Sequence, residues 1–215
     1  MRDLAVVEGS VHQTRGTVDG RLLGDDVLLR ILTGTKCYLS PVAPEDAEHW
    51  ARWFNDLKVT LPLGDEAWTP TTAEETREGL GEAGRHHSHL FGIVDKTSDE
   101  LIGRCVLFQI DPVNRSAMLG IVIGEKEYWG RGYGREATRL LLDYAFNLLN
   151  LNNVMLGTFS FNERALRCYR AVGFREIGRR RQARIVGDRR YDVVLMDILA
   201  EEFESPVVQG LLDTP

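Results

Sequence analysis

Cysteine is scarce in this sequence, and long apolar runs are missing. Only three of the 215 residues are cysteines, and none of them forms a C-x-x-C pair, which argues against a disulfide framework or a zinc knuckle. No apolar run approaches the about 18 residues that a membrane helix needs. The first residues also lack the basic start and long apolar centre of a signal peptide. We therefore expect a cytoplasmic protein without a membrane partner.

Motifs for metals and nucleoside triphosphates are missing too. His86, His87 and His89 are close in sequence, but their spacing fits a solvated segment before a strand better than metal ligation. No G-x-x-x-x-G-K-[ST] motif occurs, which argues against a nucleotide triphosphatase. We assign no metal.

The charge is mildly acidic overall and unevenly distributed. With 26 basic and 32 acidic residues the net charge is −6, so electrostatics alone does not indicate a general nucleic-acid binder. Between Arg175 and Arg190, however, seven arginines accompany only Glu176 and Asp188, which leaves the rest of the chain at −11. Such a run is more often a solvated strand face paired with acidic neighbours. An RNA- or ribosome-associated protein is the alternative.

The composition is that of one globular domain with short appended segments. Hydrophobic residues make up 43% and charged residues 27% of the chain, which excludes wholesale disorder. Because residues 1–35 contain five glycines and only short apolar runs, we predict an N-terminal extension there. A folded domain over residues 36–204 and a fraying C-terminal tail over residues 205–215 follow. The extension adds an edge strand or packs on a second subunit of a homodimer.

Periodicity predicts alternating strands and helices. Helical spacing places Trp50, Trp53 and Phe54 on one side of a helix that opens near Pro44. The apolar strand over residues 117–123 is expected to be buried on both faces. Further strands are predicted over residues 36–41, 90–94, 101–107, 154–159, 174–184 and 189–199, and further helices over residues 73–82, after Gly134 and from Asn162 to Gly173.

A glycine-rich segment, residues 129–135 (WGRGYGR), lies between a predicted strand and a predicted helix. Main-chain N–H groups at a helix start have no helical carbonyl partner and therefore bind anions. Glycine lets a phosphate approach the main chain closely, and Arg131 and Arg135 add positive charge. The segment predicts an anion site, with a simple tight connection as the alternative.

The same letters satisfy the dinucleotide fingerprint G-x-G-x-x-A over residues 132–137. Two features argue against that interpretation. Eight residues, 124–131, separate the strand from the first required glycine, whereas a dinucleotide-binding fold turns immediately. No acidic residue ends the next strand, residues 154–159.

Several motifs in a fixed order resemble a known family. They are residues 33–39 (TGTKCYL) with 44–48 (PEDAE), 119–124 (LGIVIG), 128–134 (YWGRGYG), 162–165 (NERA) and 169–174 (YRAVGF). Over about four-fifths of the chain the sequence resembles GNAT-superfamily N-acetyltransferases, in particular the ribosomal-protein N-terminal and spermidine acetyltransferase branch. The resemblance implies an α/β (α+β) fold, with a twisted mixed sheet of six or seven strands that is splayed between its two central strands and flanked by helices.

The resemblance also implies acetyl-CoA as the cosubstrate. The cosubstrate-binding residues it implies are Ile121, Val122 and Ile123 on a strand, Trp129, Gly130, Arg131, Gly132, Tyr133, Gly134 and Arg135 in the loop, and Asn162. Trp129 stands where the family has Gln or Arg, which removes one side-chain contact. The neighbouring strand must splay away to leave main-chain groups for the cosubstrate.

An amine that attacks a thioester needs a polarised carbonyl and a proton for the departing thiolate. The resemblance assigns the proton donor to Tyr169, which shares a helix face with Asn162. A main-chain N–H near Val122 or Ile123 would stabilise the oxyanion. Cys168 is not expected to carry the acetyl group, because neighbouring helix positions point about 100° apart.

The general base and the acceptor are not readable from the sequence. Candidates for the base are Glu125, Glu127 and His89, or only a chain of water molecules. The acceptor is a primary amine: a protein N-terminus, a polyamine or another small amine. We expect its groove near residues 50–72 and the final hairpin, with Trp53, Trp68 and Asp65 as side chains of interest. A non-catalytic acyl-CoA-binding or regulatory module is the alternative function.

Overall fold

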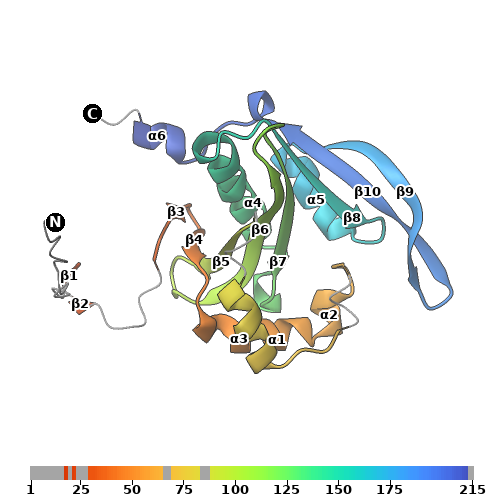
Figure 1. The fold of residues 1–215 in the computed structure, drawn as a ribbon, viewed down its shortest axis with the longest axis horizontal. Helices are drawn as coiled ribbons and strands as arrows, with labels where there is room; N and C mark the ends of the chain where they lie inside the picture. Colours follow the sequence, from red (N-terminus) through yellow and green to blue (C-terminus); the bar gives the residue numbers. More distant parts are fainter. Residues whose placement is uncertain (1–16, 19–20, 23–28, 65–68, 83–87, 213–215) are drawn as a thin grey trace, which may run out of the picture.

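The computed structural model describes residues 17–18, 21–22, 29–64, 69–82 and 88–212 (Figure 1). Its centre is an eight-stranded sheet in the order β3-β4-β5-β6-β7-β8-β10-β9. The strands are β3 (Leu32–Thr33), β4 (Cys37–Pro41), β5 (His89–Asp95), β6 (Leu101–Asp111), β7 (Ser116–Ile123), β8 (Asn153–Phe159), β9 (Arg175–Val186) and β10 (Arg189–Leu199). Neighbours are antiparallel except β7 and β8, which are parallel. The predicted mixed α/β fold is confirmed.

The described sheet has one strand more than the six or seven predicted. The additional strand is β3, which pairs with β4 through Leu32↔Leu39 and Thr33↔Tyr38. Leu32 is buried in the core. The end of the predicted extension therefore supplies an edge strand, one of the two roles that the sequence leaves open. Farther upstream, β1 (Thr17–Val18) and β2 (Arg21–Leu22) pair only with each other. The domain boundaries at residues 36 and 204 stay a prediction.

Helices cover both faces of the sheet. They are α1 (Ala47–Phe54), α2 (Leu57–Thr60), α3 (Ala73–Glu82), α4 (Tyr133–Asp143), α5 (Glu163–Val172) and α6 (Val208–Leu212). Side chains alternate along β4, so Cys37 and Leu39 join the core that α4 and α5 cover, while Tyr38 joins the core that α1 and α3 cover. Among the described residues, no helix combines the length and hydropathy that a membrane crossing requires.

The ladder between β7 and β8 is short. It joins only Ser116↔Asn153, Ala117↔Val154 and Met118↔Met155, and on that side the rest of β7 pairs with no strand in the described part of the chain. The predicted splay between the central strands is therefore present. The predicted burial on both faces is confirmed for part of the strand: Ala117 and Leu119 join the core under α4 and α5 and Val122 joins the core under α1 and α3, while the other residues are half-buried. Beyond Met118 the strand borders an open cavity instead of a second packed strand.

Residues 205–208 are anchored, so the predicted fraying does not begin at Phe203. The fully buried carboxylate of Asp143 accepts hydrogen bonds from the main-chain N–H groups of Val207 and Val208, at 2.9 and 3.0 Å. It also accepts one from the Ser205 hydroxyl at 2.6 Å. Val208 is itself buried. A buried carboxylate is stable only with such donors, so α6 and the end of α4 depend on each other.

Candidate active site

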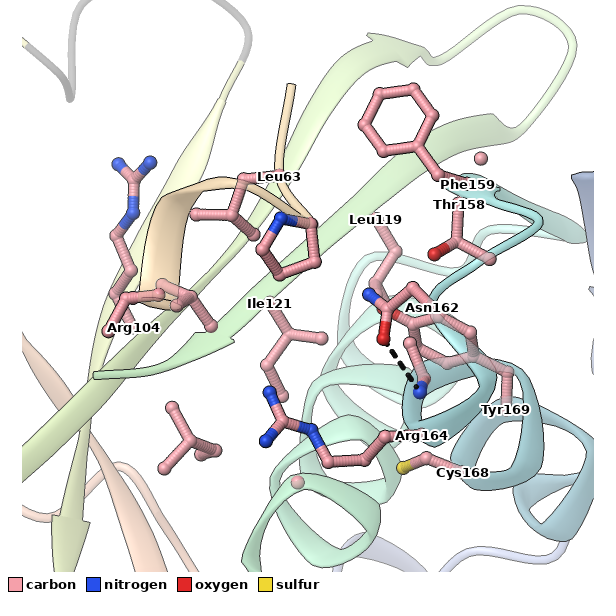
Figure 2. Close-up of a pocket in the computed structure, with 18 of the residues that line it drawn as sticks. Leu63, Arg104, Leu119, Ile121, Thr158, Phe159, Asn162, Arg164, Cys168 and Tyr169 are labelled. Atoms are coloured by element: carbon pink, nitrogen blue, oxygen red, sulfur yellow. Dashed lines mark hydrogen bonds between the residues drawn. The ribbon is translucent and has the colours of Figure 1, made fainter. Parts of the chain in front are cut away.

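A cavity of about 740 Å³ opens where the β7–β8 ladder ends (Figure 2). Its walls come from residues 119–123 of β7, residues 157–159 of β8, the glycine loop with the start of α4, and the first turns of α5. Residues 62–64, after α2, border it from the other side. The cavity thus occupies the gap that the splayed strands leave in the sheet.

Most of the predicted site residues line this cavity. They are Ile121, Val122, Ile123, Trp129, Gly130, Gly132, Gly134, Arg135, Asn162 and Tyr169. The side chains of Arg131 and Tyr133 lie elsewhere. The Arg131 guanidinium is 5.5 Å from the Tyr128 ring centre and 5.9 Å from that of Tyr133, and the Tyr133 hydroxyl donates to Asp95 at 2.5 Å. If Arg131 and Tyr133 contact a bound anion, they therefore do so through their main chain.

The glycine loop has a backbone that other residues rarely adopt. Gly130 has φ +73° and Gly132, directly before α4, has φ +93°. In that left-handed region an L side chain is strained. The loop places Gly132, Gly134 and Arg135 on the cavity wall, at the N-cap and in the first turn of α4, where main-chain N–H groups have no helical carbonyl partner. This geometry suits a phosphate group at a helix start.

The start of α4 is fixed by its own side chains. The Glu136 carboxylate accepts from the main-chain N–H of Lys36 at 2.6 Å and from the Thr35 hydroxyl at 2.8 Å. Tyr133 reaches Asp95 at the end of β5. Burial alone would raise the pKa of Asp95, but hydrogen bonds from Tyr133, Ser98 and the Thr97 N–H outweigh it and lower that pKa. The carboxylate therefore stays ionised and holds the helix start in place.

Trp129 takes a role that the sequence did not reveal. Its indole N–H donates to the main-chain oxygen of Ile123 at 2.7 Å, which ties the loop to the end of β7. The Arg164 guanidinium lies 3.8 Å from the centre of the Trp129 ring, an arrangement typical of a cation–π contact. The residue that departs from the family pattern thus connects β7, the loop and α5.

Helix α5 presents side chains to the cavity from the opposite wall. Its N-cap Asn162 accepts from the Ala165 N–H at 3.2 Å, as predicted. Figure 2 shows Asn162 and Tyr169 together on the α5 side, across from Ile121 of β7. Tyr169 is buried, and this burial, with a smaller effect of Cys168, raises the pKa of its phenol. The phenol therefore keeps its proton at neutral pH.

Cys168 also lines the cavity. Burial raises the pKa of its thiol, and a thiol that keeps its proton is a poor nucleophile. Cys168 and Tyr169 line the cavity together although they are neighbours on α5, and that Cys168 does not carry the acetyl group stays a prediction.

The candidate bases do not line the cavity. Glu125 is buried and accepts from the Trp53 indole at 2.9 Å, and it pairs with Arg52. His89 is engaged at 2.7 Å with the Tyr144 hydroxyl. Glu125 therefore has a structural role, in which it ties the segment after β7 to Arg52 and Trp53 of α1. Glu127 is not among the lining residues either, and Asp65, Trp68, His86 and His87 lie outside the described residues.

The described lining is rich in cations. It contains Arg104, Arg135, Arg164 and Arg167 and no aspartate or glutamate. Burial lowers the pKa of Arg164, because its charge is partly removed from water without a neighbouring carboxylate. Arginines together with a glycine loop at a helix start fit a ligand that carries phosphates. The residues present thus fit coenzyme A.

The fold and the cavity define a class of protein: an acyltransferase whose sheet opens to hold an acyl carrier. Residues 36–175 match the family model "Acetyltransferase (GNAT) domain". The chain therefore belongs to the GNAT acetyltransferase family and is an N-acetyltransferase.

Relatives with stated activities support this membership. The chain is 31% identical over 136 residues to spermidine N(1)-acetyltransferase of Escherichia coli K12, which covers 63% of this chain and 71% of that protein. It is 30% identical over 138 residues to N-alpha-acetyltransferase RimI of Mycobacterium tuberculosis, with 63% and 80% covered. The structure of Vibrio cholerae spermidine N-acetyltransferase with CoA and spermine aligns with TM-score 0.71 and 25% identity, over 79% of this chain and 98% of that one. The predicted resemblance is confirmed.

Proposed function

We propose that this enzyme transfers the acetyl group of acetyl-CoA directly to a primary amine, with Tyr169 as the general acid. The observation that carries the proposal is the position of Tyr169, which lines the cavity from α5 across from the unpaired part of β7. Tyr169 would contact the leaving sulfur, whereas the glycine loop and β7 would hold the rest of the cosubstrate.

The cosubstrate would lie between the splayed strands. Main-chain N–H groups from Gly130 to Gly134 would bind the pyrophosphate, and Arg135 and Arg164 would contribute positive charge. The main chain of β7 beyond Met118 pairs with no described strand on this side, so it would pair with the pantetheine arm. This pairing would give hydrogen-bond partners to main-chain N–H and C=O groups of β7 that otherwise bond to water.

The chemistry needs little from the protein beyond positioning and one proton. A main-chain N–H of Val122 or Ile123 would polarise the acetyl carbonyl while the neutral amine attacks the carbonyl carbon. As the carbon–sulfur bond breaks, Tyr169 would donate its proton to the thiolate. The nitrogen would lose one proton to water, and the phenolate would regain one from water before the next turnover. Because burial keeps the pKa of Tyr169 above its ordinary value, the phenol carries its proton at neutral pH and has one to donate.

The acceptor would carry a single amine rather than several. Relatives are named for spermidine and for protein α-amino groups. A polyamine keeps positive charges along its length, and these favour carboxylates in the wall of its site. The described lining contains four arginines and no carboxylate, which favours a protein N-terminus or another amine with one positive charge.

A thiol-release screen tests the function and the acceptor class together. The enzyme is incubated with acetyl-CoA and N-terminal peptides, polyamines or amino sugars, with a reaction that lacks acceptor as the control for hydrolysis. We expect thiol release with peptides to exceed release with polyamines. Tight binding of acetyl-CoA by calorimetry, with no release above the control for any amine, would establish the non-catalytic acyl-CoA-binding module instead.

A further inference from the structure

The hairpin of β9 and β10 extends beyond the sheet as a free ribbon (Figure 1). β8 pairs with β10 only as far as Phe159↔Val193, while β9 and β10 continue to the turn at Gly187. We call residues 180–192 the basic ribbon. Most of its residues are exposed, whereas Arg184 is buried and Tyr191 and Asp192 are half-buried against residues 159–161.

The arginines of the basic ribbon differ from those at its base. Arg175 pairs with Glu202 and Arg179 pairs with Glu176, each at 2.6 Å, as expected for a solvated strand face. The outer arginines are exposed and form no ion pair within the part of the chain that the structure describes; they are Arg180, Arg181, Arg189 and Arg190. The ribbon contains five arginines against Asp188 and Asp192, so it carries a net positive charge in a chain of net charge −6 and forms a local positive field.

The ribbon also continues one wall of the cavity. Arg180 lies opposite Val193, and Val193 lies opposite Phe159. Residues directly opposite in antiparallel strands share a face of the sheet. Val193 and Phe159 line the cavity, so Arg180 lies on the same face, in the same row across the strands, on the edge strand β9. A polymer bound there would run toward the cavity.

A cluster of aromatic rings marks the base of the ribbon on that face. Phe159 and Phe161 are stacked with ring centres 5.6 Å apart and planes 9° apart, and Tyr191 contacts Phe161 edge-on at 4.6 Å. The Arg184 guanidinium lies 4.8 Å from the Phe159 ring centre. Phe159, Phe161 and Tyr191 are only half-buried, so part of each ring surface remains accessible.

We propose that the basic ribbon and this aromatic cluster bind a single-stranded nucleic acid. Arginines that track the phosphates, combined with aromatic rings on which bases stack, are the features that bind single strands without reading their sequence. An acidic protein segment would use the arginines but not the rings, and a duplex would keep its bases out of reach. The proposal is independent of the acetyl transfer proposed above, because it needs neither acetyl-CoA nor Tyr169.

The test is fluorescence anisotropy of labelled oligouridine and oligothymidine of about 12 nucleotides, a length within the range of single-strand sites. We expect saturable binding of both at about 50 mM salt. With four phosphate contacts, affinity should fall about 50-fold between 50 and 200 mM salt. A preference for oligouridine would identify RNA as the ligand, and equal binding would identify single strands of either kind.

Two charge variants distinguish binding by the basic ribbon from a general effect of the protein's net charge. Arg180→Gln, Arg181→Gln, Arg189→Gln and Arg190→Gln together should abolish the binding. The control combines Lys58→Gln, Arg77→Gln, Lys96→Gln and Arg139→Gln, which removes the same charge elsewhere and should leave most of the affinity. Both variants should keep the parent's melting temperature in acetyl-CoA, which shows that they fold. Equal binding by the ribbon variant and the parent, or no saturable binding by the parent, overturns the proposal.

A third variant separates nucleic acid from acidic protein. Phe161→Leu keeps an apolar side chain but removes a stacking surface, and should weaken oligonucleotide binding about tenfold without changing binding of polyglutamate. If polyglutamate binds as tightly as the oligonucleotides and Phe161→Leu changes neither, the partner is an acidic protein and the proposal is wrong. None of these outcomes bears on thiol release, so failure here leaves the transferase proposal standing.

Discussion

Helices α4 and α5 border the same cavity but contribute different kinds of groups to it. α4 contributes main chain, through the left-handed glycines that precede it. α5 contributes side chains, chiefly Asn162 and Tyr169. A site made of main chain tolerates substitution as long as the backbone path is kept. A site made of side chains depends on the chemistry of single residues.

The two helices are also anchored differently. At the start of α4, Glu136 and Tyr133 point away from the cavity and bond to β4 and β5. α5 is fixed by its cap and by the buried Leu166 and Val172. Because α4 contributes main chain to the site, its polar side chains are available to anchor the helix. In α5 the same few positions serve both for anchoring and for chemistry.

The largest expected effect comes from α5. Tyr169→Phe removes one oxygen from a buried ring and keeps its packing. If Tyr169 donates the proton, kcat should fall about 100-fold or more, while binding of acetyl-CoA by calorimetry stays near that of the parent. The matched control is Tyr144→Phe, which removes the phenol hydroxyl of a half-buried tyrosine that bonds to His89 outside the cavity and should leave kcat unchanged.

A pH profile sharpens the same test. Because the pKa of Tyr169 is raised, its phenol stays protonated at and beyond its ordinary value of about 10. The parent's rate should therefore rise with pH as the acceptor amine becomes neutral, and show no decline from loss of the phenol proton below about pH 10. A full rate in Tyr169→Phe, or a decline near pH 8 that this variant lacks, would contradict the assignment.

The second effect tests the main chain before α4. Gly132→Val forces a β-branched residue to φ +93°, which strains the loop by about 1–3 kcal/mol. At about 100 times its Kd, acetyl-CoA should stabilise the parent by about 2.7 kcal/mol, and the variant should lose most of that stabilisation in a thermal melt.

Gly187→Val provides the control for strain. Gly187 has φ +61° at the tip of the hairpin and no neighbouring atom within 4 Å of an added Cβ. It should lose a similar amount of stability but keep the full response to acetyl-CoA. If Gly132→Val also keeps that response, the loop is not the phosphate site.

Features with local sequence signals were predictable, and features that join distant segments were not. The glycine loop, the Asn162 cap and the hairpins depend on neighbouring residues, and the structure has them where they were expected. The bond from Trp129 to Ile123 joins a loop to a strand end, and no spacing rule reveals it. The sequence left Glu125 open as a possible base. Its burial against Trp53 depends on a helix about 70 residues earlier in the chain, and no local pattern reveals that contact.

The same distinction explains the ends of the domain. The edge strand β3 has only two residues, which is too short for a periodic pattern. α6 is held by Asp143, a single acidic residue near the end of α4 that carries no sign of its distant partners. By contrast, the splay was expected only through the family resemblance, because strand pairing is set by tertiary contacts and not by the sequence of either strand alone.

A smaller effect is expected at the start of α5, where one residue serves two purposes. Asn162→Ala removes the acceptor for the Ala165 N–H and should lower the free energy of unfolding by about 1 kcal/mol, or about 2–4 °C in melting temperature. Asn162→Asp keeps an accepting oxygen and should restore that stability. If the aspartate variant still binds acetyl-CoA less tightly than the parent, the amide also serves the cosubstrate. An alanine variant as stable as the parent would show that the cap contributes nothing.

The smallest effect should come from the connection between loop and strand. Trp129→Phe keeps a ring beneath Arg164 but removes the donor to the Ile123 oxygen, a change worth about 1 kcal/mol. Because the loss concerns the position of the loop and not the proton donor, KM for acetyl-CoA should rise about fivefold with kcat unchanged. The control is Trp50→Phe, since the buried Trp50 indole N–H has no hydrogen-bond partner among the residues that the structure describes, and its loss should leave KM unaltered. A fall in kcat for Trp129→Phe would mean that the loop and α5 act as one unit, and the division between main-chain and side-chain helices would no longer hold.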